Sequence, residues 1–252
     1  MRIYLALLCL AFVLSSAVLT QAQDARRRSA IDYYNRANEW QKQGRLDQAL
    51  IDYDFALTFD ATLEQAWNNR CVVHYLKSEY LAAIADCSKA LELKPAYAEA
   101  WNNRGNARLE QGEVAAAISD FDQAIKLDAR YAAAFHSRGT TRHAQRHFAE
   151  AILDYSRTIE LQPQYATAWQ NRGVAHKDKG EFAQALSDFN QAIKLNPRRA
   201  AFWAQRGLTQ LLLGKSNAAE ADFDECIRLD PGLQSSLEVQ INAAKQLRVA
   251  GR

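Results

Sequence analysis

The 252-residue sequence has only four prolines, and it lacks the short motifs that mark common catalytic and nucleotide-binding sites. There is no GxGxxG, no phosphate-binding loop with its lysine, no GxSxG and no HExxH. The many carboxylates instead recur at helical spacing, as they do on solvated helix faces. These absences predict a protein that is not an enzyme and that needs no cofactor.

An excess of either charge is also absent, because 31 Lys and Arg face 29 Asp and Glu, for a formal net charge of +2. Such a balance gives no general attraction to nucleic acid or to an anionic membrane. A hydrophobic content of 48% with 24% charged residues is typical of a globular chain. We therefore expect a protein or peptide partner and no nucleic acid.

Long hydrophobic runs are confined to the N-terminus. A positive start at residues 1–2 precedes an apolar core at 3–14 and a small-x-small cleavage site at 20–22. This layout predicts a secretory signal peptide over residues 1–22, and hence export to a periplasm or out of the cell. An uncleaved membrane anchor is the alternative, because about 17 apolar residues reach the short limit for a span. Residues 23–29 form a polar lead-in whose three arginines are solvated or, alternatively, touch lipid headgroups.

A period of 34 residues organises the rest of the chain. The stretch 98–131 recurs without insertion or deletion, and Trp101 and Ala117 have counterparts in the neighbouring copies. A fixed period in this range indicates a stacked repeat array, because one unit cannot bury its apolar face alone. The six copies span residues 30–233, as 30–63, 64–97, 98–131, 132–165, 166–199 and 200–233.

Each copy has the pattern of two helices joined by a tight turn. In the third copy, apolar spacings of three and four predict helices over Ala98–Gln111 and Glu113–Leu127, with Gly112 at the turn. Glycine tolerates the positive φ that such a turn needs, and Ser78 and Arg146 replace it in the second and fourth copies. The prolines follow second helices and keep the next helix from fusing with them; they are Pro95, Pro163, Pro197 and Pro231.

Packing within a copy is expected to depend on a small residue. Gly105 should let the two helices approach closely, with Phe121 filling the gap beside them. After residue 233 the period stops, but Leu237, Ile241 and Ala244 still form one apolar stripe. This stripe predicts a C-terminal capping helix within residues 234–252.

The repeated positions resemble the signature of the tetratricopeptide repeat family. They are an aromatic at the fourth position, glycine at the eighth, alanine at the twentieth, an aromatic at the twenty-fourth, alanine at the twenty-seventh and proline at the thirty-second. The resemblance covers residues 30–233. It implies an all-α, right-handed solenoid of helix-turn-helix repeats, whose first helices line a concave groove that binds peptides or partner proteins. The sequence departs from the family at the seventh position, where leucine is usual and this chain has arginine in every copy.

Each of these arginines has an aspartate sixteen residues further along. Because an isolated buried charge is very costly, an arginine in the packed layer needs a paired acid. We predict a ladder of six structural ion pairs that fixes the register of the helices; the alternative is that the arginines bind an anionic ligand. The arginines are Arg36, Arg70, Arg104, Arg138, Arg172 and Arg206, and the aspartates are Asp52, Asp86, Asp120, Asp154, Asp188 and Asp222.

A row of amides follows one face of the first helices. An amide both donates and accepts hydrogen bonds, so it can satisfy the backbone of a peptide without reading its sequence. The row resembles the asparagine ladder in the repeat region of O-linked N-acetylglucosamine transferases, which holds a peptide by its backbone; alternatively, these are ordinary exposed polar residues. The predicted peptide-binding residues are Asn35, Asn69, Asn103 and Asn171, with Asn68, Asn102, His136 and Gln170 beside them and Asn38 and Asn106 along the groove wall.

Two of the four cysteines fall in one repeat. Cys71 replaces the glycine of the helix crossing and Cys87 replaces the aromatic, at positions expected to face each other. In an oxidising compartment this predicts a Cys71–Cys87 disulfide, which closes a loop of about 15 residues and contributes roughly 3 kcal/mol in the chain-entropy model. Two small buried thiols are the alternative. Cys226 replaces an alanine and is expected to be a small buried residue.

Together these patterns favour a non-enzymatic, exported scaffold that binds an extended peptide or a partner protein in its groove. The alternative is an assembly or targeting subunit of a larger cell-envelope complex, which uses its convex face or its terminal helix. Exposed apolar residues on that helix would favour the alternative. His143 and His147 have a metal-like spacing, but no acid or thiol completes a ligand set, so no metal site is predicted.

Overall fold

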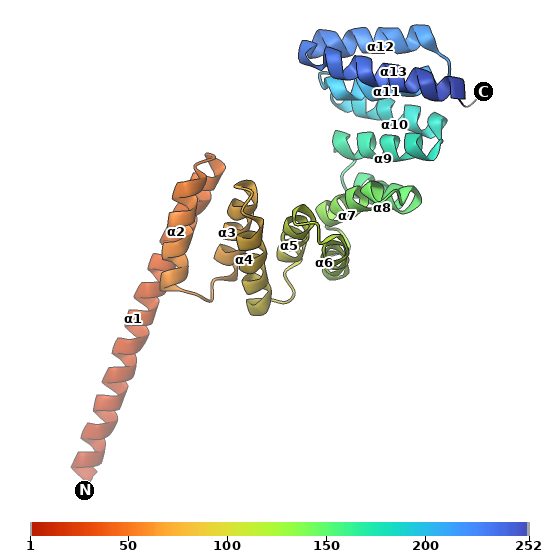
Figure 1. Ribbon diagram of the computed structural model, residues 1–252. Coiled ribbons are helices and arrows are strands. Elements are labelled where there is room, and N and C mark those ends of the chain that lie inside the picture. The colour runs from red at the N-terminus through yellow and green to blue at the C-terminus, as the bar shows by residue number, and fades with distance from the viewer. Residues whose placement is uncertain (1, 251–252) are drawn as a thin grey trace. The chain divides into compact units, whose positions relative to one another are not determined.

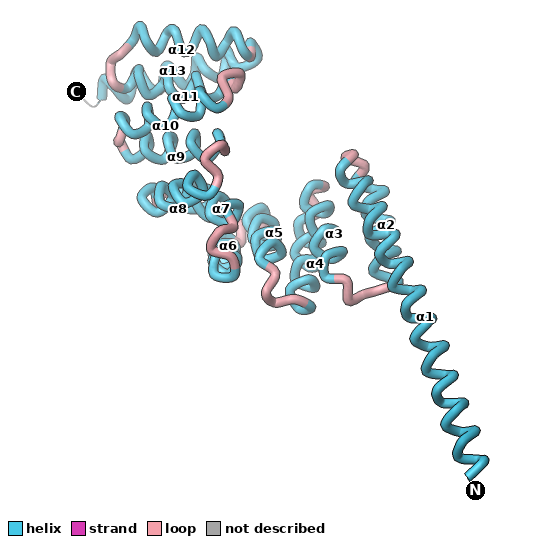
Figure 2. The backbone as a smooth tube through the Cα atoms, turned by 180° about the vertical axis from the view of Figure 1, so that it is seen from behind, coloured by secondary structure: helices cyan, strands magenta, loops and turns pink. Residues whose placement is uncertain are grey.

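The computed structural model describes the backbone of residues 2–250 and the side chains of residues 20, 21 and 23–247. All regular elements in this described part are helices, so the predicted all-α class is confirmed (Figure 2). The chain forms two compact units, residues 1–127 and 128–252, which we describe separately.

The N-terminal unit contains the first three repeats (Figure 1). Its first helix, α1, is continuous from Arg2 to Lys42, so the predicted boundaries at residues 22 and 29 lie inside one helix. No proline or glycine interrupts residues 2–42, which removes the usual reasons for a break. Of the described helices, none is long and apolar enough to cross a membrane. The helices are α1 (Arg2–Lys42), α2 (Leu46–Phe59), α3 (Glu64–Leu76), α4 (Tyr80–Leu93), α5 (Ala98–Glu110) and α6 (Val114–Leu127).

The C-terminal unit contains repeats four to six and a terminal helix. That helix, α13, begins after a single 3₁₀ turn and packs mainly against α11, burying Leu237 and Ala244 as the predicted cap requires. Its elements are α7 (Ala132–Ala144), α8 (Phe148–Leu161), α9 (Ala166–Lys179), α10 (Phe182–Leu195), α11 (Ala200–Leu212), α12 (Ser216–Leu229), η1 (Pro231–Leu233) and α13 (Gln234–Ala250).

The turns inside the repeats have the left-handed backbone that the sequence register predicts. Gly112 has φ +79°, and the two non-glycine replacements also adopt this region, with φ 61° at Ser78 and 65° at Arg146. At each of these turns, backbone N–H groups satisfy the last carbonyls of the preceding helix, as Glu113 N does for Arg108 O at 2.9 Å. The repeat geometry therefore overrides the ordinary reluctance of a residue with a Cβ to take positive φ.

The two helices of a repeat meet around one buried aromatic. A Cβ added to Gly105 would lie 2.6 Å from Phe121 Cε1, and Phe121 is fully buried. Where tyrosine takes this place, its hydroxyl keeps a partner, since Tyr53 Oη donates to Asn38 Oδ1 at 2.6 Å. In repeat two a disulfide replaces the glycine and the aromatic: Cys71 and Cys87 are bonded, with their Cα atoms 5.4 Å apart. The predicted disulfide is thus confirmed, and Cys226 is a buried free thiol.

Neighbouring repeats within a unit join through the loop before each first helix. The indole N–H of Trp67 donates to Ala61 O at 2.9 Å, and that of Trp101 donates to Pro95 O at 2.8 Å. Trp169 makes the same bond to Pro163 O in the C-terminal unit. The aromatic at the fourth position therefore fixes the inter-repeat loop as well as filling the core.

Candidate functional site

Each ladder arginine meets the aspartate sixteen residues further along through two parallel hydrogen bonds. In repeat three, Arg104 Nε and Nη2 donate to the two oxygens of Asp120, both at 2.9 Å. The same fork forms in every repeat, with N···O distances from 2.5 to 3.1 Å. The six aspartates are buried, so the fork supplies the charge and the donors that a buried carboxylate needs.

The ladder arginines also join successive repeats. Arg70 Nη1 donates to Asp54 of the preceding repeat at 2.5 Å, and Arg104 Nη1 donates to Ser88 at 3.2 Å. In the C-terminal unit, Arg172 and Arg206 do the same to Ser156 and Asn190, at 3.0 and 2.7 Å. The guanidinium planes lie over the aromatics at the fourth position; the distances from Cζ to the ring centroid are 4.6 Å for Trp67 and Trp101, 4.9 Å for Trp169 and 4.8 Å for Trp203.

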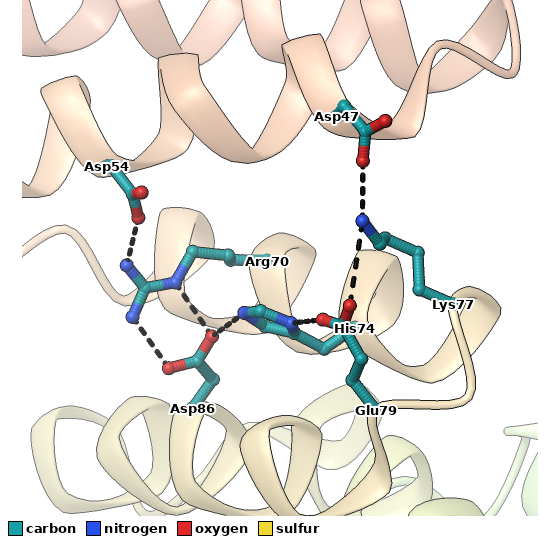
Figure 3. A network of polar contacts seen from close by, with 7 residues as sticks. All are labelled: Asp47, Asp54, Arg70, His74, Lys77, Glu79 and Asp86. Carbon is teal, nitrogen blue, oxygen red and sulfur yellow. Dashed lines mark hydrogen bonds and ion pairs between the residues drawn. The ribbon is translucent and has the colours of Figure 1, made fainter.

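Repeat two shows how far such a network extends. Burial alone would lower the pKa of Arg70, but the hydrogen bonds that it donates to Asp86 and Asp54, with the charges of both acids, outweigh burial and raise that pKa. His74 Nε2 lies 3.6 Å from Asp86, and its Nδ1 lies 2.6 Å from Glu79. Figure 3 shows the connected set, which joins α2 to α3 and α4: Asp47, Asp54, Arg70, His74, Lys77, Glu79 and Asp86. These charged groups pair with one another within the protein, which favours a structural role for the arginines over ligand binding.

The predicted amide row lies on the first helices, and several of its members bond one another. Asn69 Nδ2 donates to Asn38 Oδ1 at 2.9 Å, and Asn103 Nδ2 donates to Asn68 Oδ1 at 3.0 Å, each across a repeat boundary. In the C-terminal unit, Asn171 Nδ2 lies 3.0 Å from His136 Nε2, and burial lowers the pKa of that histidine. Asn68 and Asn102 are buried, Asn35 is exposed, and Asn106 and Gln170 are half-buried. These amides therefore hold neighbouring repeats together, and peptide binding by them stays a prediction.

The C-terminal unit also contains a cleft of about 1120 Å³ between the ends of α9 and α11 and the inner side of α13. We call it the C-terminal cleft. Leu208 and Leu212 of α11 line it on one side, and Ala243 and Leu247 of α13 line it on the other. Leu247 is 66% exposed and gives the cleft an apolar rim. Charged residues, among them Arg146, Lys177 and Lys179, line the cleft as well, so it combines apolar walls with polar groups, as ligand sites do.

Lys177 is the polar group of interest in this cleft. Its side chain is 17% exposed, and its Nζ donates to Gln205 Oε1 at 2.8 Å. The nearest carboxylate, Asp178, lies 3.9 Å away and is itself bonded to His143 Nε2 at 2.9 Å. Burial lowers the pKa of Lys177 despite the opposing charge of Asp178. An ammonium group with one neutral hydrogen-bond partner retains donors for an anionic ligand.

The histidines and acids do not assemble a metal centre in the described part of the chain, where no group of three or more such side chains is suitably placed. His143 bonds Asp178 rather than acting with His147, which is exposed. The sequence pattern gave no sign of the C-terminal cleft, because it depends on how the non-repeating helix α13 crosses α11. It also gave no sign of the Nη1 bonds between repeats, although an acceptor residue recurs sixteen residues before four of the arginines.

Family models match this chain over just over half of its length. The tetratricopeptide repeat model matches residues 98–131 and 166–199, a related TPR repeat model matches residues 72–112, and another tetratricopeptide repeat model matches residues 200–233. With the helix pairs described above, these matches show that the chain belongs to the tetratricopeptide repeat family. Proteins of this family are typically non-enzymatic interaction scaffolds, and no catalytic family is among the matches.

Solved structures show the same fold. The chain is 25% identical to the MamA protein over 69% of this chain and 94% of that chain, with a TM-score of 0.58. It is also 25% identical to YrrB, described as a TPR protein with an unusual peptide-binding site, over 71% of this chain and 92% of that chain, with a TM-score of 0.55. The pilF protein of Pseudomonas aeruginosa, 18% identical, is similar in fold over 90% of this chain and 100% of that chain, with a TM-score of 0.74. No curated protein matches the sequence.

Proposed function

We propose that this protein is a scaffold that binds an extended segment of a partner polypeptide, anchored in the C-terminal cleft. The observation that carries the proposal is Lys177, a largely buried ammonium group beside the apolar walls of the cleft. A peptide that places a carboxylate on Lys177 and a large apolar side chain against Leu212 and Leu247 would satisfy both features. The peptide-binding site described for YrrB supports the same class of ligand.

We propose the amide row of the N-terminal unit as a second, separate peptide-binding surface. Asn35 is exposed, and Asn69 and Asn103 are half-buried, so their remaining donors and acceptors are available to a peptide backbone. Amides of this kind bind backbone irrespective of sequence, whereas the cleft selects an acid beside an apolar residue.

The test starts from a defined ligand. Peptides are selected from a random library on the purified protein, and their affinity is measured by fluorescence anisotropy. We expect the selected sequences to combine an acidic residue with a large aliphatic or aromatic one. Lys177→Ala should weaken binding about tenfold or more, because a charge-assisted hydrogen bond is lost. Selected peptides that bind Lys177→Ala with unchanged affinity would contradict the proposal.

Helix α13 offers a matched pair of variants. Leu247 and Val239 are 66% and 69% exposed, but only Leu247 lines the cleft. Leu247→Glu should therefore weaken binding of the selected peptide, and Val239→Glu should leave it unchanged. The double variant Asn69→Ala with Asn103→Ala tests the amide row in the same assay, with thermal unfolding as the control for folding.

One observation favours a second candidate function, an assembly or targeting subunit that grips a partner through its terminal helix. Val239 lies exposed on α13 outside the cleft, where a large apolar residue has no role in packing. A partner lost on Val239→Glu but kept on Leu247→Glu would select this function over groove binding.

We further propose that the protein acts after export, with residues 1–22 removed. The buried disulfide supports an oxidising compartment. N-terminal sequencing of the protein from fractionated cells tests this directly. A start at residue 23 in the periplasmic or secreted fraction is expected, whereas a start at residue 1 would mean that the segment is kept as an anchor.

A further inference from the structure

Repeat one ends the array without a preceding repeat to cover it. We call this surface the open end; it comprises the sides of α1 and α2 around Arg36. The side chain of Arg36 is 56% exposed, whereas those of Arg70 and Arg104 in the same unit are 17% and 13% exposed. Arg36 bonds Asp52 through Nε and Nη2, but its Nη1 has no acceptor within the described part of the chain. Repeat one therefore presents a surface that later repeats bury.

The later repeats show what covers such a surface. In repeats two, three, five and six it is a helix, and that helix places one oxygen acceptor opposite the arginine Nη1. The four acceptors are a carboxylate, two hydroxyls and an amide: Asp54, Ser88, Ser156 and Asn190. These repeats therefore indicate that a helix covering repeat one would present a carboxylate, hydroxyl or amide oxygen to Arg36.

The open end is also more apolar than its counterparts. Phe55 is 46% exposed, and the other repeats carry a polar or charged residue at its position, such as Lys89 and Gln123. Tyr33 stacks on Phe55 and Phe59, with ring centroids 5.0 and 5.6 Å apart. An exposed aromatic cluster of this kind marks an interaction surface rather than ordinary solvated helix.

Two arginines lie along the α1 side of the open end. Arg26 is exposed and lies seven residues before Tyr33, on the same side of α1, and Arg36 lies three residues after Tyr33. Asp24 lies on the opposite side by helical spacing, whereas Asp32 lies four residues before Arg36 and flanks it. A helix that covers the aromatic cluster therefore meets Arg26 at one end and Arg36 at the other, and an acidic helix complements the pair.

We propose that the open end is a docking surface for an acidic, amphipathic α-helix of a partner protein. The helix would lie over Phe55 and Tyr33 and place a carboxylate, hydroxyl or amide oxygen on Arg36 Nη1. The surface lies in the N-terminal unit and shares no residue with the C-terminal cleft, so it does not depend on the groove function proposed above.

The chain supplies a probe for this proposal. Helix α2 covers the equivalent surface of repeat two, is acidic, and presents Asp54 to Arg70. A fluorescein-labelled peptide of residues 46–59 is titrated with the full-length protein and followed by anisotropy. A hydrocarbon staple on the side away from Asp54 holds it helical, because a free helix of this length is marginal in water. Saturable binding is expected.

Matched variants decide where the peptide binds. Phe55→Glu should weaken binding about tenfold or more, since it removes an aromatic anchor and repels an acidic helix. Leu81→Glu, on α4 and 70% exposed, makes the same kind of change elsewhere and should leave binding unchanged. A peptide with Asp54→Ala should bind about threefold to tenfold more weakly, because it has no acceptor for Arg36.

A second variant guards against misfolding. Ile51→Glu lies on α2 beside Arg36 and Trp40, is 54% exposed in the wild type, and should weaken binding in the same way. Binding that survives both Phe55→Glu and Ile51→Glu would overturn the proposal. The proposal would also be overturned if the wild type bound lipid vesicles but no peptide, and Phe55→Glu lost the vesicle binding. The surface would then be assigned to membrane binding. Dimerisation in analytical ultracentrifugation that Phe55→Glu abolishes would reassign it to a second copy of the chain.

Discussion

Repeat one and repeat three contain the same ion pair in two different settings. Both arginines fork onto the aspartate sixteen residues further along, yet Arg104 is 13% exposed and Arg36 is 56% exposed. Asp120 receives a second cation from Arg108 Nη1 at 2.8 Å, whereas Asp52 receives a neutral indole N–H from Trp40 at 2.9 Å. Repetition in sequence therefore does not mean equal energies, because the cover supplied by the neighbouring repeat sets how much water screens the pair.

The largest expected effect tests this difference directly. Asp120→Ala leaves Arg104 and Arg108 largely buried without their carboxylate, and should lower the free energy of unfolding by about 3–5 kcal/mol. Asp52→Ala leaves an arginine that water already reaches, and should cost about 1 kcal/mol. Urea unfolding followed by circular dichroism measures both. Equal losses for the two variants would remove the distinction between the open end and the interior.

Repeat two gives the next largest effect. In this repeat a disulfide takes the place of the small residue and the aromatic that pack together in the other repeats. Changing Cys71 and Cys87 together to alanine should lower the free energy of unfolding by roughly 3 kcal/mol, because the unfolded chain regains the freedom of the closed loop. Treating the wild type with reductant under unfolding conditions should give the same loss. Cys226→Ala, a buried free thiol outside the disulfide, is the control and should change stability much less.

A smaller effect compares the helix crossings of repeats three and one. Gly105→Ala should destabilise the protein by about 1–3 kcal/mol, because the new Cβ would lie 2.6 Å from Phe121 Cε1. Repeat one already has Ala37 at this position beside Tyr53, so its crossing accommodates a methyl group. Ala37→Gly should therefore cost only about 1 kcal/mol, through lost helix propensity. Thermal unfolding of both variants is the measurement, and a Gly105→Ala protein as stable as the wild type would contradict the close approach.

The smallest expected effect is on how stability changes at low pH. The hydrogen bond from Arg36 lowers the pKa of Asp52, and burial opposes it. A carboxylate with a lowered pKa contributes stability that is present above its ordinary pKa and is lost as the pH falls through the folded-state value. The stability of Asp52→Asn should consequently change less than that of the wild type below pH 3.8. Urea unfolding at successive pH values checks this, and parallel curves for the two proteins would refute it.

The repeated part of the structure follows closely from the sequence. The predicted helices Ala98–Gln111 and Glu113–Leu127 are observed as Ala98–Glu110 and Val114–Leu127. The register alone places Ser78 at a turn of positive φ. Because the six copies align without insertions, Ser78 falls at the position that holds glycine in the third copy. The disulfide was predictable for the same reason, since both members of a packing pair change together in one copy.

What the sequence does not reveal is the crossing of elements that do not repeat. The stripe of α13 predicts that it packs, but not that it leaves a cleft beside Lys177. Likewise, spacing along one helix shows which amides share a face, but not that Asn103 reaches Asn68 on the neighbouring helix. Contacts of this kind depend on distances between helices, which composition and period do not encode.

The bond from four of the ladder arginines to the preceding repeat bears on how such a chain can gain or lose repeats. A carboxylate, a hydroxyl and an amide all serve as its acceptor, so one copy does not need a particular predecessor. Excising residues 64–97 would bring Asp54 opposite Arg104, a pairing that Arg70 already shows to be workable. Whole modules of 34 residues are thus interchangeable at their joints, and duplication or loss of a copy can change the length of the protein without a new interface having to evolve.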